Sequence, residues 1–165
     1  MEILRWLKHL SHGHWHLRHT FPAATLQAVE AAIREVESTH HGQIRFAVEA
    51  ALDIGPLCRN QAARERAIEV FSRLRVWDTE HNNGVLIYLL LADRDVEIIA
   101  DRGVYARVGQ QGWESICRDM EAEFRAGRFE AGVLVGIRAV SAHLRKHYPS
   151  QGAGANELPD QPVLL

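Results

Sequence analysis

Side chains able to bind a ligand or transfer a proton gather around an apolar region in the middle of the chain. They comprise carboxylates, an imidazole, two amides and a guanidinium: Asp78, His81, Asn82, Asn83, Asp101 and Arg102. An imidazole titrates near neutral pH, an amide both donates and accepts hydrogen bonds, and a carboxylate attracts a cation. These side-chain types suit a small polar or anionic ligand, so the six residues are the candidate ligand-binding site.

The same residues also fit a purely structural interpretation. The Asn-Asn-Gly of residues 82–84 is typical of turns, and Asp101 with Arg102 can form a surface ion pair. A second polar group, the Asp-Arg-Asp of residues 93–95, lies between two apolar runs, and we interpret it as turn chemistry without a function. The candidate site is therefore a hypothesis that depends on the arrangement of the strands.

The N-terminal segment offers a different chemistry, because it is rich in histidine. His12, His14 and His16 alternate, so in an extended arm all three would face one way, and imidazole is a ligand for zinc, copper or nickel. Structural zinc sites normally pair histidine with cysteine at short spacing, and no cysteine lies near these residues. The three histidines are metal candidates by composition only, and adventitious binding is the favoured interpretation.

The composition of the 165-residue chain indicates one globular domain. Apolar residues make up 47% and charged residues 24%, and 19 Lys and Arg against 21 Asp and Glu give a net charge of −2. Such a chain can bury a core, and its charge argues against nucleic acid as a partner. Cys58 and Cys117 form no CxxC pair, and we interpret both as ordinary small apolar residues.

Nothing in the sequence predicts a segment that crosses a membrane. The longest apolar run, residues 84–92, is far shorter than the roughly 20 residues that a transmembrane helix needs. The first residues, MEILRWLKH, lack the basic start and the uninterrupted apolar stretch of a signal peptide. We therefore expect a cytoplasmic protein.

Hydrophobic periodicity predicts the elements that position the candidate site. Apolar side chains recur at helical spacing in four segments, which begin near Pro22, Asn60, Trp113 and Phe129. Residues 43–50 alternate between apolar and polar, which predicts a strand with one apolar face. Residues 84–92 are uniformly apolar, as in a strand covered on both faces, and residues 96–100 complete a hairpin with them.

The predicted fold is α/β: a small mixed β-sheet of three to four strands, with a βαβ crossover and a hairpin, sandwiched between helices. The hairpin places the start of one strand beside the end of the next. Asn83 and Asp101 should therefore lie together at one end of the sheet.

Three parts of the chain are expected to differ in structure. Residues 1–19 form an amphipathic, His-rich segment, with a short helix and an irregular arm. The helix is expected to dock on this domain, on a partner or, weakly, on an anionic membrane. Residues 20–148 form the α/β domain, and residues 149–165 lose all periodicity and are predicted to be disordered.

The middle of the chain resembles the TPM domain, a family that includes a thylakoid-lumen phosphatase-like protein, photosystem II repair factors and many bacterial proteins. The resemblance covers roughly residues 20–148. Its most specific parts are the stretch NNGVLIYLLLADRDVEI and an F-x-x-G-x-F-x-x-G pattern, made by Phe124, Gly127, Phe129 and Gly132. The family fold, a sheet sandwiched by helices, agrees with the layout predicted from periodicity.

The resemblance implies acid phosphatase activity with a divalent cation such as calcium. In the family, acidic ligands stand just before the first domain helix and in the loop after the last hairpin strand. Here Thr20 and Phe21 occupy the first place, and Gln110 and Gln111 lie near the second. Loss of two carboxylates should weaken a calcium site severely, and phosphoryl transfer without a metal lacks its main charge stabilisation.

The sequence therefore favours a divergent, cytoplasmic TPM-domain protein that acts as a non-catalytic binding or accessory module, with a protein partner or a small anionic ligand. The first alternative is a phosphatase dependent on calcium or another divalent cation. The second alternative is a peripheral membrane adaptor that uses residues 1–19.

Overall fold

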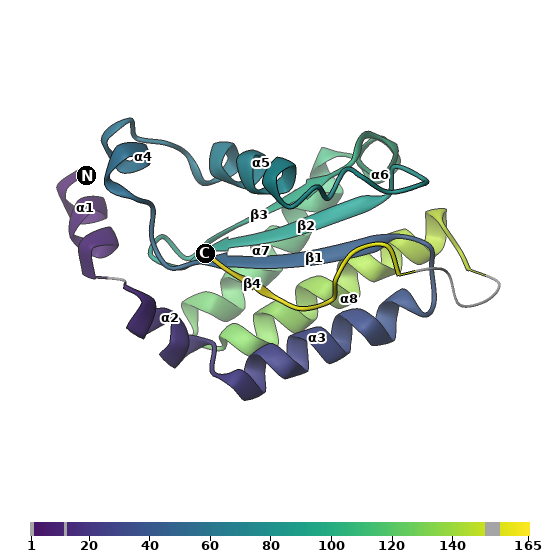
Figure 1. The fold of residues 1–165 in the computed structure, drawn as a ribbon, viewed down its shortest axis with the longest axis horizontal. Coiled ribbons are helices and arrows are strands. Elements are labelled where there is room, and N and C mark those ends of the chain that lie inside the picture. The colour runs from purple at the N-terminus through teal and green to yellow at the C-terminus, as the bar shows by residue number, and fades with distance from the viewer. Residues whose placement is uncertain (1, 12, 151–155) are drawn as a thin grey trace.

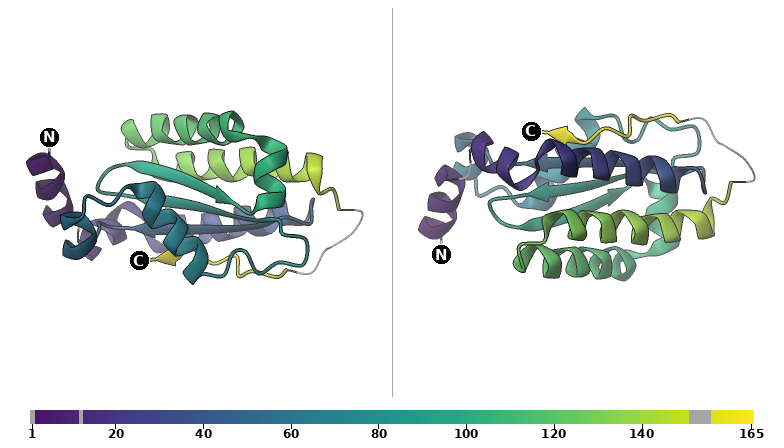
Figure 2. Two further views of the ribbon diagram at one scale, coloured as in Figure 1. Left: turned by 90° about the horizontal axis from the view of Figure 1, so that it is seen from above. Right: turned by 90° about the horizontal axis from the view of Figure 1, so that it is seen from below.

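A computed structural model describes residues 2–11, 13–150 and 156–165 as a three-layered molecule (Figure 1). A mixed four-stranded sheet forms the middle layer, and helices cover both of its faces (Figure 2). The α/β fold predicted from the sequence is confirmed. Within the part of the chain that the structure describes, none of the helices has the length and apolar content needed to cross a bilayer.

The sheet has the strand order β3-β2-β1-β4. Its strands are β1 (Gln43–Glu49), β2 (Gly84–Leu90), β3 (Asp95–Ala100) and β4 (Val163–Leu164). β1 pairs in parallel with both β2 and β4, whereas β2 and β3 form the predicted antiparallel hairpin. β3 is therefore the last strand at one edge of the sheet.

One face of the sheet carries the larger helical layer. It consists of α3 (Ala23–Glu37), α7 (Gln110–Arg125) and α8 (Phe129–His147), with the short α2 (His14–Thr20) and α6 (Arg102–Val108). The side chains of Val85, Ile87 and Leu89 point into this layer, where they join one hydrophobic core. The helix α6 was not expected from the sequence.

The opposite face is covered by α5 (Ala63–Arg73) and α4 (Ile54–Cys58). Alternate side chains of β2, at Leu86, Tyr88 and Leu90, form a second core beneath them. β2 is thus buried on both faces, as its uniformly apolar sequence predicts.

β1 has the apolar face that its alternation predicts, formed by Ile44, Phe46 and Val48, but its other face is buried as well. Its polar side chains have partners from distant segments. Glu49 accepts two hydrogen bonds from the Arg66 guanidinium, both at 2.9 Å, and one from the Tyr88 hydroxyl at 2.6 Å. A charge can be buried when it is paired in this way.

The prediction of an irregular arm after the first helix is wrong for residues 14–20. Residues 14–20 form α2, which places Leu17 in the core at 1% exposure. His14 and His16 are two positions apart on this helix, so they project in roughly opposite directions. They do not share the face that an extended arm would give them, and His12 lies outside the described residues.

The N-terminal helix α1 (Glu2–Ser11) docks on the domain. Arg5 and His9 both lie against the Asp93 carboxylate, at 3.0 and 3.2 Å, and the Leu52 backbone N–H donates to His9 Nδ1 at 2.9 Å. Asp93 is therefore more than a turn residue, because it connects α1 to the turn between β2 and β3. The interpretation of residues 93–95 as turn chemistry alone is therefore wrong.

Disorder was predicted throughout residues 149–165, but residues 156–165 run along β1 and add β4 to the sheet. Side chains of β1 hold the backbone of this segment. Gln43 Oε1 accepts the N–H groups of Glu157 and Leu158 at 2.8 and 3.0 Å, and the Arg45 guanidinium donates to the Pro159 and Gln161 carbonyls. The segment lacks periodicity because specific polar contacts, and not a repeating apolar face, fix its position.

Candidate functional site

The structure brings Asn83 and Asp101 to the same end of the sheet, as the hairpin predicts. The Asp101 N–H donates to the Gly84 carbonyl at 2.9 Å, which continues the β2–β3 ladder by one step. Asn83 is fully buried, its amide Nδ2 donates to the His41 carbonyl at 2.8 Å, and its backbone N–H donates to Thr79 Oγ1 at 3.0 Å. These contacts give Asn83 a structural role.

The other predicted residues at this end are dispersed or engaged. Asp78 is exposed and pairs with Arg75 at 2.7 Å, while the exposed His81 ring lies edge-on to the ring of His41. Asn82 is exposed and takes a positive φ of 50°, and Arg102 is exposed as well. These side chains therefore do not surround a common position for a ligand.

Asp101 acts first as the cap of α6. Its Oδ1 accepts the Arg102 backbone N–H at 2.6 Å, which satisfies a donor at the start of that helix. Its Oδ2 and the Asn83 Oδ1 are both buried without a hydrogen-bond partner among the described residues. Across the described ranges, no three His, Cys, Asp or Glu side chains lie close enough to hold a metal ion. This end of the sheet thus has two buried oxygen acceptors without a described partner, which we call its open oxygens.

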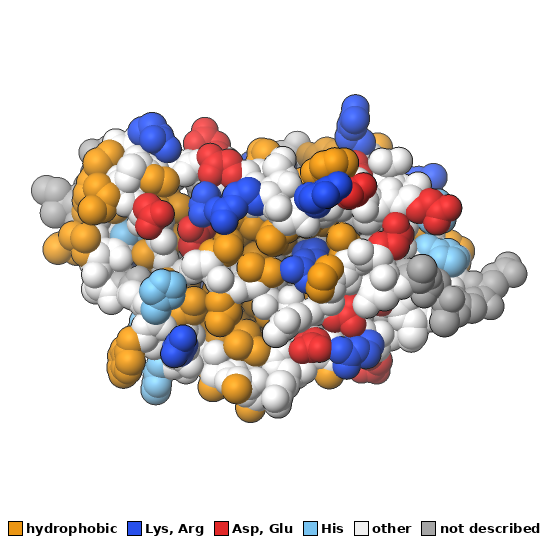
Figure 3. Space-filling model, in the orientation of Figure 1, with side chains coloured by type: hydrophobic (Ala, Val, Ile, Leu, Met, Phe, Trp, Pro, Cys, Tyr) orange, Lys and Arg blue, Asp and Glu red, His pale blue; other side chains and the backbone are white. Residues whose placement is uncertain are grey.

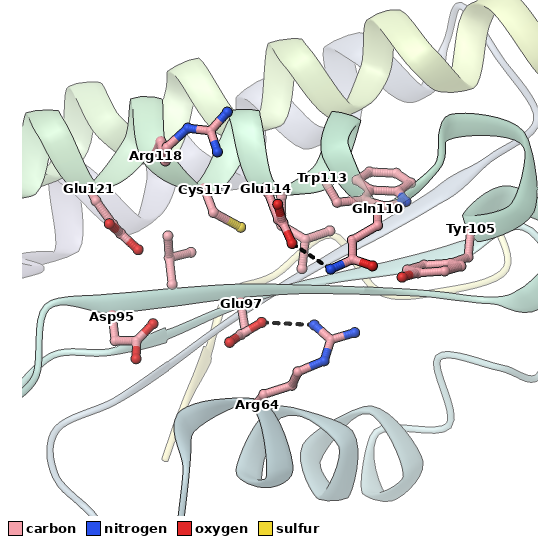
Figure 4. Close-up of a pocket in the computed structure, with 12 residues that line it drawn as sticks. Arg64, Asp95, Glu97, Tyr105, Gln110, Trp113, Glu114, Cys117, Arg118 and Glu121 are labelled. Atoms are coloured by element: carbon pink, nitrogen blue, oxygen red, sulfur yellow. Dashed lines mark hydrogen bonds and ion pairs between the residues drawn. The ribbon is translucent and has the colours of Figure 1, made fainter.

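A groove that sequence reasoning missed lies along β3, between α5 and α7 (Figure 4). Its volume is about 510 Å³. Four carboxylates and two guanidinium groups line it: Asp95, Glu97, Glu114, Glu121, Arg64 and Arg118. We call this feature the acidic groove.

One wall of the acidic groove is formed by the strand β3 and the other by the helix α7. Asp95 and Glu97 are two apart on β3, so both point to the α5 face, where Arg64 pairs with Glu97 at 3.0 Å. On the other wall, Glu114 and Glu121 are seven apart and share one side of α7. Figure 4 shows the carboxylates of both walls on either side of the β3 backbone.

The lining of the acidic groove has more carboxylates than guanidinium groups, so its formal charge is negative. Burial, together with repulsion from Glu97, Glu121 and Asp93, raises the pKa of Asp95 to about 6. Burial, followed by the charge of Glu97, raises the pKa of the neighbouring Cys117 thiol to about 12. Cys117 is consequently a neutral thiol at physiological pH and is a poor nucleophile.

Comparison with known proteins decides the family. The model of the TPM domain matches residues 17–143, which is well over half of the chain. The chain belongs to the TPM domain family.

The solved structures that resemble this TPM domain agree with its fold. The NMR structure of BA42 protein from the psychrophilic bacterium Bizionia argentinensis is 29% identical, with a TM-score of 0.76 over 87% of this chain and 94% of that chain. The N-terminal domain of a protein from P. gingivalis is 20% identical, with a TM-score of 0.61 over 78% and 81%, and supports the fold alone. Among curated proteins, none matches the sequence.

The two positions at which the family resemblance implies acidic ligands do not lie together in this TPM domain. Phe21 is buried at 1% exposure, and its ring packs against those of Phe46 and Phe129. Gln110 donates to Glu114 at 2.7 Å inside the acidic groove. α3 ends shortly before the first residue of β1, whereas α6 follows the last residue of β3 and leads into α7. The starts of α3 and α7 therefore lie at opposite ends of the sheet (Figure 1). The residues at the two positions therefore do not fit a calcium site.

Two spacings in the sequence could have indicated the acidic groove. Asp95 and Glu97 alternate on an edge strand, and Glu114, Cys117 and Glu121 recur at helical spacing beside an apolar stripe. Neither spacing is unusual alone. Only the packing of α7 against β3 brings the two sets together.

Proposed function

We propose that this TPM domain acts as a non-catalytic binding module, and that its ligand site is the acidic groove. The ligand is a positively charged segment of a partner protein in the cytoplasm. The exposed Cys58 and the partly buried Cys117 are both free thiols, which supports a reducing compartment.

A single observation carries this proposal: four carboxylates and two guanidinium groups line a groove of about 510 Å³. The raised pKa of Asp95 comes first from burial and then from the neighbouring carboxylates, which destabilise it as an anion. A Lys or Arg side chain placed in the groove would relieve this repulsion. Binding should therefore release protons, and it should be weaker at pH 5 than at pH 7.5.

The proposal is tested by isothermal titration of a ten-residue lysine peptide. We expect the double variant Asp95→Asn/Glu121→Gln to weaken binding by about fivefold or more, because charged contacts in a groove are worth more than exposed ones. Glu35→Gln/Glu80→Gln is the matched control, since it removes two exposed carboxylates outside the groove. Equal losses in the two variants would show that the peptide responds only to net charge, and would overturn the proposal.

A second candidate function is supported by the open oxygens of Asn83 and Asp101. Under this alternative, a divalent cation would bind at their end of the sheet and assist phosphate ester hydrolysis. A phosphatase assay with calcium, magnesium or manganese, run beside Asp101→Asn, separates the candidates. We expect no activity above buffer, and a metal-dependent rate that Asp101→Asn abolishes would establish the enzyme.

Exposed apolar residues support the third candidate, a weak contact with an anionic membrane. Leu7, Leu10 and Trp15 are 58%, 68% and 78% exposed, and apolar side chains gather at this end of the molecule over α1 (Figure 3). So few anchors give weak, salt-sensitive binding. Co-sedimentation with anionic vesicles, compared between the wild type and Leu7→Ser/Leu10→Ser, tests this contact without disturbing the buried Leu17.

A further inference from the structure

The two edges of the sheet differ in how they are covered. At the β1 edge, the chain's own residues 163–164 pair as β4, and the Leu165 N–H donates to the Val48 carbonyl at 3.0 Å. At the other edge, no described strand pairs with the outer side of β3. An extended segment already completes one edge, and the acidic groove runs along the other.

The hydrogen-bond pattern of the hairpin shows which groups of β3 face the groove. In an antiparallel pair, successive residues point their backbone groups alternately toward and away from the partner strand. Because the Asp101 N–H donates to Gly84 of the β2 side, Ile99, Glu97 and Asp95 also point toward β2. The backbone groups of Val96, Ile98 and Ala100 therefore point outward.

One of the outward donors, the Ile98 N–H, has only a weak acceptor. The Ile98 N–H donates to the Cys117 sulphur, which is a weak acceptor, and Val96 and Ile98 both line the groove. An added strand would replace that contact with a carbonyl and would complete the ladder. Six residues of β3 would accommodate a partner segment of roughly 20 Å.

Charge determines which strand fits. Charged side chains on an edge prevent pairing with other edges, and a second copy would place its own Asp95 and Glu97 against these carboxylates. A segment with Lys or Arg at every second position would instead place cations beside Asp95 and Glu97, which share one face of β3. Its alternate side chains would meet Cys117 on the α7 side, between Glu114 and Glu121.

We propose that an extended segment of a partner protein adds to the outer edge of β3 as a fifth strand, with basic residues at alternate positions. This inference rests on the proposed binding function and adds to it the geometry of the ligand. Backbone hydrogen bonds to Val96, Ile98 and Ala100 hold the segment, and the carboxylates of the acidic groove select its sequence.

The test uses the full chain and an eight-residue peptide of alternating Lys and Thr, blocked at both ends. Amide hydrogen exchange is followed by NMR with and without the peptide. We expect exchange at Val96 and Ala100 to slow by about tenfold or more, since a new hydrogen bond protects each amide. Ile99 is the internal control, because its N–H already points toward β2 and should not change.

Two peptides with the same charge provide the matched control. One is N-methylated at its Lys positions and the other at its Thr positions, so that each loses every second N–H group. Strand addition predicts that one of them binds at least about tenfold more weakly than the other, because only alternate N–H groups of an added strand face β3.

The possible outcomes separate the two proposals. Peptide binding that depends on Asp95 and Glu121, without protection of Val96 and Ala100 and with equal affinity for both methylated peptides, overturns strand addition and leaves the binding function intact. Peptide binding that does not respond to Asp95→Asn/Glu121→Gln overturns both.

Discussion

The guanidinium of Arg5 donates to the carboxylate of Asp93 at 3.0 Å and thereby joins the N-terminal helix to the turn between β2 and β3. The two side chains are 23% and 18% exposed, so the pair is partly shielded from water. Arg5 also donates to Asn60 Oδ1 at 2.8 Å and to the Gln61 carbonyl at 2.9 Å. One arginine on α1 therefore contacts both the hairpin and the segment that leads into α5.

Asp93→Ser should release α1 without unfolding the sheet, because Arg5 and His9 lose their shared carboxylate. Hydrogen bonds to charged groups contribute about 1.5–3 kcal/mol each. We expect faster amide exchange in residues 5–11 and a lower Tm. Asp78→Ser is the control, since it removes an exposed carboxylate whose pairing with Arg75 is worth at most about 1 kcal/mol. Similar changes in both variants would contradict the proposed link.

Docking of the C-terminal segment should weaken as pH rises. Burial raises the pKa of Glu37 to about 8, and the charge of Asp160 in the C-terminal segment and its side-chain hydrogen bond contribute to this rise. Glu37 accepts the Ile44 N–H at 2.6 Å, and it faces Arg45 on β1. Arg34 on α3 lies 3.3 Å from Asp160.

The direction of the pH dependence of stability follows from the raised pKa of Glu37. A carboxyl whose pKa is higher in the folded state gives its full contribution below the unfolded value near 4.5 and loses it as pH rises toward 8. The free energy of unfolding should fall by up to about 1.4 kcal/mol per pH unit across this range through Glu37 alone. In Glu37→Gln this part of the slope should disappear, as measured by urea unfolding at pH 5, 7 and 9. An unchanged slope would show that Glu37 does not titrate in this range.

The sequence predicts those elements whose stability is local and repetitive. Residues 84–90 are apolar at every position, and this pattern identified a strand buried on both faces. It could not predict that β1 is equally buried, because the partners of Glu49 are Arg66 and Tyr88, which lie 17 and 39 positions away.

The candidate site was harder to predict for the same physical reason. Asn83 and Asp101 were correctly placed together, since a hairpin requires it, but their hydrogen bonds are mainly structural. The acidic groove depends on a helix that packs beside an edge strand, which no local pattern specifies. The C-terminal strand depends on Gln43 and Arg45, whose side chains hold backbone groups more than 100 positions away.

Calcium should bind to this TPM domain weakly or not at all. The two positions at which the family resemblance implies acids hold Thr20 with Phe21 and Gln110 with Gln111, and none of these side chains supplies the carboxylate charge on which calcium affinity depends. We expect calorimetry to give a dissociation constant weaker than about 10 μM, the weak limit of the sensor range. A tighter constant that Asp101→Asn abolishes would instead identify the open oxygens of Asn83 and Asp101 as a cation site.

Gly84→Ala should be the most damaging small substitution at the start of β2. A Cβ atom at Gly84 would lie 2.0 Å from the Val76 carbonyl oxygen, which is backbone and cannot rotate away. Overlap in a packed core typically costs about 1–3 kcal/mol, and a clash with backbone this close should cost about 3 kcal/mol or more. The clash would also displace the Gly84 carbonyl, which accepts the Asp101 N–H, so the variant should loosen α6 as well.

Gly55→Ala is the matched control, because its nearest neighbour, Arg59, is 3.9 Å away, and alanine normally stabilises a helix relative to glycine. Thermal unfolding of the two variants decides the matter, and a Gly84→Ala protein as stable as Gly55→Ala would mean that the chain before β2 can move aside.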